Sequence, residues 1–431
     1  MQTRDHEHAQ QFAVDVVKKL RDAGFEAYWA GGCVRDRLLG KEPKDYDVAT
    51  AATPDEIRRV FGKRHTRAVG AAFGVICVIG PKRAGTIEVA TFRRDAAYSD
   101  GRHPDAISFS TAEHDAQRRD FTINGLFFDP IAERVIDFVG GQRDLQGRVV
   151  RAIGDAEQRL HEDRLRMLRA VRFAATFDFA LDERTLAAIQ KLAHSLVAVS
   201  AERIAGELRM MLIGPNRVRA VELLRESGLL EVVLPEAAAI AQRDTEADAS
   251  RGETSWARTM RVLGHLQAPS FALALAALLR EFWSNEARVR EIGGRWRLSN
   301  AEVGVAAWLL SHVGVVLEAR SITWSHLQPI LAAPHAVELV ALAEAIVHAT
   351  AEPTTHVDYC RQKLALPPHE LDPPALLDGD DLKACGVPAG PVYRDLLTAV
   401  RDAQLEGAIA DKPQALDLAL RLWRQEESKE T

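Results

Sequence analysis

Two acidic residues one position apart, Asp45 and Asp47, mark the place in this sequence where chemistry is expected. They open a stretch, residues 44–50, that predicts a β-strand, and side chains alternate between the two faces of a strand. Both carboxylates would therefore point the same way, where they repel each other and require cations. A pair of divalent ions held by such oxygen ligands would serve phosphoryl or nucleotidyl transfer. The alternative interpretation is a surface strand with two solvated acids.

A pair of glycines precedes these acids. Residues 26–30 predict a strand, Gly31 and Gly32 a turn, and residues 34–39 a short helix. Glycine allows backbone amides to approach a phosphate closely, and a helix N-terminus adds a favourable dipole. The glycine turn therefore predicts a phosphate site next to the carboxylate pair.

A third carboxylate, Glu88, lies in the alternating stretch of residues 86–92. If this stretch forms a strand beside Asp45 and Asp47, Glu88 would complete the coordination of two metal ions. An ordinary acid on an edge strand explains Glu88 equally well at this stage.

A further set of polar side chains lies in residues 161–172, which predict a helix. Asp163 and Arg166 are three residues apart, so on a helix they would lie side by side. An acceptor beside a forked donor matches the base-pairing edges of C and A, whereas U and G present the opposite pattern. A charged helix face with internal salt bridges is the alternative.

The elements that must position these residues fall into two parts. The first part is a mixed α/β segment ending near Gly147; from Arg151 onward the apolar residues follow a helical period. The expected strands cover residues 26–30, 45–49, 74–79, 86–92, 125–129 and 134–137, and the first expected helices after Arg151 cover residues 160–177, 182–193, 201–213, 218–227 and 257–267.

Composition indicates a globular protein of 431 residues, 47% hydrophobic and 27% charged. No run of ~18 apolar residues or signal peptide is apparent, so no membrane association is expected. The four cysteines are scattered without a C-x-x-C pair, which favours a reducing cytoplasm. The net charge of −6 argues mildly against a nucleic-acid partner, but residues 142–173 carry eight arginines against five acids, enough for a local basic face.

The sequence GGCVRDRLLG, followed by DYD, resembles the signature of the class II nucleotidyltransferases, which comprise tRNA CCA-adding enzymes and bacterial poly(A) polymerases. Three later stretches, in residues 118–126, 140–174 and 201–212, resemble the later motifs of that family in the same order, and weaker similarity extends to about Asp417.

The resemblance implies roles for individual residues. Asp45, Asp47 and Glu88 would be catalytic, with Asp45 and Asp47 holding two Mg²⁺ ions. Asp100 and Arg102 would belong to a flexible loop that favours addition of the terminal A. The implied nucleotide-binding residues are Gly31, Gly32, Arg35, Arg118, Arg119, Asp120, Asn124, Asp163, Arg166, Arg169 and Arg172.

The resemblance also implies an α+β fold and an activity. A polymerase-beta-like head with a mixed β-sheet would cover residues 1–147, followed by an all-α neck (148–214), body (215–315) and tail (316–431). The implied activity is tRNA 3′-end maturation by template-independent addition of CCA from CTP and ATP, with release of pyrophosphate. An A-adding enzyme, a poly(A) polymerase and a catalytically silent RNA-binding module remain alternatives.

The body departs from the family pattern. In many relatives it carries histidines of a metal-dependent phosphohydrolase signature, and here Ala257, Arg258, Arg280 and Glu281 stand in the corresponding places. Because arginine cannot bind a cation, the body is expected to be a scaffold without hydrolase activity. Glu202, Arg203 and Glu207 are expected to brace the neck through a charge network.

Overall fold

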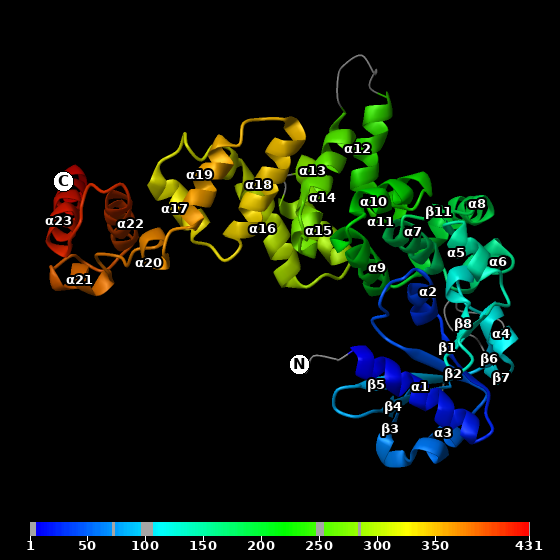
Figure 1. Ribbon diagram of the computed structural model, residues 1–431. Coiled ribbons are helices and arrows are strands. Elements are labelled where there is room, and N and C mark those ends of the chain that lie inside the picture. The colour runs from blue at the N-terminus through cyan, green and yellow to red at the C-terminus, as the bar shows by residue number, and fades with distance from the viewer. Residues whose placement is uncertain (1–5, 71–73, 96–106, 247–253, 283–285, 431) are drawn as a thin grey trace. The chain divides into compact units, whose positions relative to one another are not determined.

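The computed structural model describes residues 6–70, 74–95, 107–246, 254–282 and 286–430 (Figure 1). The chain divides into two compact units, Met1–Ala238 and Ala239–Thr431, which are described in turn. The predicted α+β class is confirmed, with a mixed sheet near the N-terminus and helices in the remainder. The finer division into head, neck, body and tail stays a prediction.

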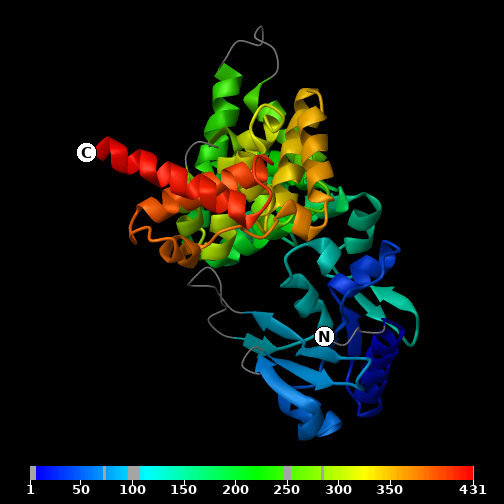
Figure 2. The ribbon, with the colours of Figure 1, turned by 90° about the vertical axis from the view of Figure 1, so that its left-hand side faces the viewer.

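A seven-stranded sheet forms the centre of the N-terminal part, and Figure 2 shows its strands side by side. The strand order is β3-β4-β5-β2-β1-β8-β9, and β2 and β5 are the parallel pair among antiparallel neighbours. The strands are β1 (Ala27–Ala30), β2 (Asp47–Thr50), β3 (Thr66–Gly70), β4 (Val75–Ile79), β5 (Thr86–Thr91), β8 (Phe127–Asp129) and β9 (Arg134–Ile136). Two small sheets join β6 (Arg93–Asp95) to β7 (Ile107–Phe109) and β10 (Val149–Val150) to β11 (Ala180–Leu181).

One face of the large sheet is covered by α1 and α3, which contact each other and lie across the strands (Figure 1). The covered face carries the alternate apolar residues of β2, β4 and β5, including Val48, Ile76 and Val89, all nearly inaccessible. A capping box between Thr53 and Glu56 fixes the start of α3, because each residue satisfies a backbone amide of the other. The residues that alternate with these in the same strands point to the opposite face of the sheet.

The helices of the first unit follow the sheet in the order of the chain. They are α1 (His6–Asp22), α2 (Gly32–Leu38), α3 (Pro54–Phe61), α4 (Ala112–Gln117), α5 (Gly141–Gln146), α6 (Ala156–Glu162), α7 (Arg166–Phe177), α8 (Glu183–Leu192), α9 (Ala201–Ile213), α10 (Arg217–Glu226) and α11 (Leu230–Val233), and α12 (Pro235–Glu246) begins here and continues into the second unit.

The second unit is helical. Its remaining helices are α13 (Ser255–His265), α14 (Phe271–Leu278), α15 (Glu286–Arg295), α16 (Asn300–Leu317), α17 (Trp324–Leu331), α18 (Ala336–Thr350), α19 (Thr355–Leu364), α20 (Pro368–Leu371), α21 (Gly379–Ala384), α22 (Val392–Leu405) and α23 (Lys412–Glu430). The last three helices share a hydrophobic cluster of their own, which includes Leu382, Leu396 and Ala415.

By length and apolar composition, α16 matches a membrane span, and the bent pair α17 and α18 matches only if counted as one segment. The prediction that no segment approaches this length and composition is therefore wrong for α16. The helix packs against α14, α15 and α18, and Leu309, Leu310 and Val313 are among its buried residues. These contacts are those of a core helix in a helical bundle.

The expected strands 26–30, 74–79, 86–92, 125–129 and 134–137 correspond to β1, β4, β5, β8 and β9 with ends shifted by one or two residues. Five further strands, β3, β6, β7, β10 and β11, were not predicted, and none of them exceeds five residues. The expected helix over residues 160–177 is wrong, because the chain leaves the helical conformation between α6 and α7.

Candidate active site

One cavity of about 880 Å³ opens on the face of the large sheet that α1 and α3 leave uncovered. The strands contribute Asp47, Val48 and Ala49 from β2, Val75 from β4, and Glu88 and Ala90 from β5. All the predicted catalytic and nucleotide-binding residues line it: Gly31, Gly32, Arg35, Asp45, Asp47, Glu88, Arg118, Arg119, Asp120, Asn124, Asp163, Arg166, Arg169 and Arg172. The predicted loop residues Asp100 and Arg102 lie outside the described residues.

Two of the three carboxylates, those of Asp47 and Glu88, are brought together by the parallel pairing of β2 and β5. In this register Asp47 and Glu88 are direct partners, so they stand next to each other on one face. Asp45 was expected inside the strand, but β2 begins at Asp47 and Asp45 precedes it. Exposure still alternates, because Tyr46 is buried and its two acidic neighbours are exposed. Within the described ranges no three His, Cys, Asp or Glu side chains converge tightly enough to form a metal site as they stand.

The glycine turn leads from β1 into α2. Gly31 has φ 73°, a conformation that glycine adopts without strain. A Cβ at Gly31 would also lie 2.7 Å from Nη1 of Arg119, which requires that side chain to move. The amide of Gly31 donates to the carbonyl of Leu126 at 3.0 Å, so it is engaged in the sheet and not directed at a ligand. The role of the Gly31–Gly32 turn in binding a phosphate stays a prediction.

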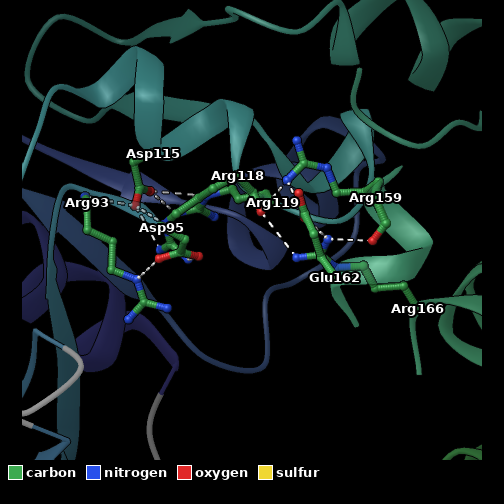
Figure 3. A network of polar contacts seen from close by, with 8 residues as sticks. All are labelled: Arg93, Asp95, Asp115, Arg118, Arg119, Arg159, Glu162 and Arg166. Atoms are coloured by element: carbon green, nitrogen blue, oxygen red, sulfur yellow. Dashed lines mark hydrogen bonds and ion pairs between the residues drawn. The ribbon is translucent and has the colours of Figure 1, made fainter. Parts of the chain in front are cut away.

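Arg118 and Arg119 are held by one buried carboxylate, that of Asp115 on α4 (Figure 3). Its Oδ1 accepts from Nε and Nη2 of Arg118, both at 2.8 Å, and its Oδ2 accepts from Nε and Nη2 of Arg119 at 3.3 and 3.0 Å. Burial raises the pKa of Asp115, but the charges and hydrogen bonds of Arg119 and Arg118 outweigh burial and hold that pKa below its usual value. The two guanidinium groups are thus fixed at the cavity wall.

This arrangement extends to the small β6–β7 sheet. Asp95 forms an ion pair with Arg93 at 2.9 Å and lies 3.7 Å from Nη1 of Arg118 (Figure 3). The backbone amide of Arg93 lies 3.4 Å from Oδ1 of Asp115. The end of β6 is therefore connected to the arginine pair of the cavity.

Arg35, Asp120, Asn124 and Arg169 bind one another. Arg35 donates to Oδ1 of Asn124 at 2.6 Å, and Asn124 donates to Asp120 at 3.0 Å. Asp120 also accepts two hydrogen bonds from Arg169, at 2.9 and 2.6 Å. Burial raises the pKa of Asp120, but Arg169 and the other donors outweigh it and lower the pKa. These residues form a rigid wall that spans three separate stretches of the chain.

Asp163 and Arg166 do not share a helix face as expected. Asp163 follows the last residue of α6 in an extended conformation, and Arg166 is the first residue of α7. Asp163 accepts from Arg203 at 2.8 Å, and Arg166 donates to Glu162 at 2.7 Å. Both residues nevertheless line the cavity, because the break between the helices turns them towards it.

Glu162 joins two arginines at this break (Figure 3). Its Oε2 accepts from Arg159 at 2.8 Å and from Arg166 at 2.7 Å. Both arginines also approach the carbonyl oxygen of Arg118 at 3.4 Å. Arg166, one of the two base-selecting residues implied by the sequence, thus contacts the backbone of the arginine pair.

Two of the three residues expected to form a bracing charge network, Arg203 and Glu207, make such contacts. Glu207 is 5% exposed and accepts from Arg172 at 2.5 Å, with Arg169 at 3.9 Å. Arg203 binds Asp163, as described above. The charge network of α9 therefore reaches the cavity wall.

Three cavity or wall residues were missed at the sequence level: Asp115, Arg159 and Phe173. Asp115 precedes the arginine pair at i+3 and i+4 spacing, a helical ion-pair signal that could have identified it. The ring of Phe173 lies 5.4, 5.2 and 4.2 Å from the guanidinium carbons of Arg35, Arg169 and Arg172. No local spacing distinguishes Phe173 from an ordinary core aromatic residue.

Two protein families match this chain. The family described as "Poly A polymerase head domain" matches residues 27–151, and that described as "Probable RNA and SrmB- binding site of polymerase A" matches residues 178–240. The first range contains the glycine turn, the three carboxylates and the arginine pair.

Similar whole proteins and structures are also known. A CCA-adding enzyme of Geobacillus kaustophilus is 33% identical over 413 residues, covering 94% of this chain and 95% of that protein. A CCA-adding enzyme of Enterococcus faecalis is 32% identical over 406 residues, covering 94% of each chain. The crystal structure of the Bacillus stearothermophilus CCA-adding enzyme in complex with CTP matches with a TM-score of 0.76 at 28% identity, covering 97% of this chain and 98% of that one.

Proposed function

Because this chain belongs to the CCA-adding enzyme family of nucleotidyltransferases, we propose that it adds CCA to the 3′ end of tRNA from CTP and ATP, releasing pyrophosphate. The observation that carries the proposal is the single cavity in which a glycine turn, three carboxylates, two fixed arginines and the Asp163–Arg166 pair meet. The glycine turn and the arginines would bind the phosphates, the carboxylates would bind metal ions, and the Asp163–Arg166 pair would bind the base.

The carboxylates fit a divalent cation. Asp45, Asp47 and Glu88 are exposed into one cavity and supply only oxygen ligands, which Mg²⁺ prefers. We propose that Asp45 and Asp47 hold two Mg²⁺ ions and that Glu88 supports them. Bound divalent ions would lower the pKa of the RNA 3′-hydroxyl and neutralise charge on the departing pyrophosphate.

The fixed cations bind the triphosphate in this proposal. Arg118 and Arg119 are pre-oriented by Asp115, and a planar guanidinium donates two hydrogen bonds to phosphate oxygens. Arg35 is already bound to Asp36 and Asn124, so its contribution is to position the wall beside Gly32. Because these hydrogen-bond donors are already oriented, they need not rearrange when negative charge develops on the phosphates during transfer.

Asp163 and Arg166 select the base in this proposal. Asp163 accepts from the amino group of C or A, and Arg166 donates to ring acceptors. Asp163 is oriented by Arg203 and by the amide of Leu165. Arg166 is oriented by Glu162 and by the carbonyl of Arg159. A base with the opposite pattern leaves buried groups unpaired, which disfavours U and G.

The test uses three tRNAs: one lacking CCA, one ending after the first C, and one ending after the second C. Each is incubated with one labelled nucleotide at a time, and product lengths are read on a gel. We expect CTP to extend the first two substrates and ATP to extend only the third. Incorporation of ATP alone would identify an A-adding enzyme, long A tracts a poly(A) polymerase, and no incorporation a silent RNA-binding module.

The cytoplasm is the proposed compartment, since tRNA is the substrate. All four cysteines are free thiols, which suits a reducing environment.

A further inference from the structure

A second cavity, of about 230 Å³, lies within the second unit and has no part in the proposed reaction. Residues of α13, α16 and α18 and of the 3-10 turn η6 (Arg280–Phe282) form its walls. Five lining residues are aliphatic, and three are charged. The lining residues are Arg258, Arg280, Glu281, Leu310, Val313, Leu317, Leu342 and Ile346.

The charged part of this cavity carries an excess of positive charge. The side chain of Arg280 is 17% exposed, and its Nη1 is buried without a hydrogen-bond partner. The nearest carboxylate oxygen of Glu281 lies 3.7 Å from this nitrogen, beyond hydrogen-bond distance. A buried, unpaired donor of a charged group is costly, so its retention requires an explanation.

Burial is the main influence on the Arg280 guanidinium, and charges of both signs lie near it. Burial lowers the pKa of its guanidinium, and the positive charge of Arg258 acts in the same direction, while Glu281 and Glu352 act against them. Two guanidinium groups and one carboxylate therefore line an otherwise aliphatic chamber. An anion between the two arginines would supply the missing acceptor.

We propose that this cavity binds a small organic anion, with a phosphate or carboxylate group between Arg258 and Arg280 and a short apolar body against the aliphatic walls. Guanidinium groups bind such oxyanions through paired hydrogen bonds, and the apolar walls strengthen the interaction by excluding water. The volume is below the roughly 300 Å³ at which pockets for drug-sized ligands begin, so a nucleoside triphosphate does not fit.

The experiment is isothermal titration of the full-length protein with phenyl phosphate, in the presence of saturating CTP so that the N-terminal cavity is filled. We expect one binding event that Arg280→Gln and Arg258→Gln each weaken at least about tenfold, since each removes a charge-assisted contact. Arg290→Gln is the matched control, because Arg290 is exposed and paired with Glu286 in the same unit. The affinity for CTP stays unchanged in all three variants.

Two further probes define the ligand class. Inorganic phosphate should bind at least about tenfold more weakly than phenyl phosphate, because it forgoes the aliphatic walls. Hexanoate tests which head group the cavity prefers. If hexanoate binds more tightly than phenyl phosphate, the preferred head group is a carboxylate; if it binds more weakly, the preferred head group is a phosphate.

The proposal is overturned by any of three results. These are no heat of binding and no shift in melting temperature at millimolar probe, undiminished binding by both Arg280→Gln and Arg258→Gln, or equal weakening by Arg290→Gln. Equal affinity for inorganic and phenyl phosphate would remove the organic part of the proposal.

Discussion

Replacing Asp115 by Asn should weaken the use of CTP and ATP by the same factor. Besides the amide of Arg93, the Asp115 carboxylate accepts four N–H contacts from the arginine pair, two from Arg118 on one oxygen and two from Arg119 on the other. An asparagine side chain has one acceptor oxygen and an amide that repels a guanidinium. One arginine therefore loses its anchor, and the triphosphate must order it on binding.

The magnitude follows from the bonds that are lost. Hydrogen bonds to charged groups contribute about 1.5–3 kcal/mol, and about 1.4 kcal/mol is tenfold in binding. We expect KM to rise by about 10- to 100-fold for both nucleotides, because the triphosphate is common to them, and kcat to fall less. The ratio of kcat/KM for CTP and ATP should stay within about twofold of the unsubstituted protein.

The assay measures initial rates with CTP on tRNA lacking CCA and with ATP on tRNA ending in CC. Glu113→Gln is the matched control, since Glu113 is an exposed acid on the same helix. A melting curve establishes that the Asp115 variant is folded at the assay temperature. If the folded variant keeps both KM values within about twofold, the arginine pair does not bind the triphosphate as proposed.

Three more predictions test the rest of the site. Glu162→Gln removes the partner of Arg166 and should reduce the preference for CTP over UTP by about tenfold, as competition assays would reveal, with little change in triphosphate binding. Asp45→Ala or Asp47→Ala should lower incorporation of both C and A by at least ~10³-fold while tRNA binding in gel shifts persists; near-normal rates would remove the metal assignment. Asp115 and Asp120 have lowered pKa values in the folded protein, so their charged forms stabilise the fold. This contribution is complete above about pH 4 and is lost as the pH falls through the pKa values of the folded state. Melting temperatures measured at decreasing pH should therefore fall less steeply for Asp115→Asn, and parallel curves would contradict the linkage.

The sequence was most informative where local periodicity and three-dimensional position coincide. Alternation placed Asp45 and Asp47 on one strand face and left the position of Glu88 open; the parallel register of β2 and β5 makes Glu88 a neighbour of Asp47. The helix expected at residues 257–267 was likewise evident from its apolar spacing and corresponds to α13 with both ends shifted by two residues.

Local patterns failed where long-range contacts decide the conformation. The helix expected through Asp163 breaks there, because the extended residue lets its carboxylate reach Arg203, a distant residue on α9. The amide of Gly31 donates to the carbonyl of Leu126, a long-range contact that the glycine turn alone does not reveal. Neither partner can be identified from a window of neighbouring residues, since both lie far away in the sequence.

The register between β2 and β5 also bears on how the protein acquires activity as it folds. The two strands are separated in the chain by β3 and β4, and parallel strands require such a crossover connection. The chain between the two strands must lose conformational entropy before they can pair. We therefore expect the β2–β5 pairing to form more slowly than the local helices. During refolding, the helical circular dichroism signal should therefore return before nucleotide incorporation. Asp47 and Glu88 meet only after β2 and β5 have paired, so catalytic activity itself reports a late stage of folding.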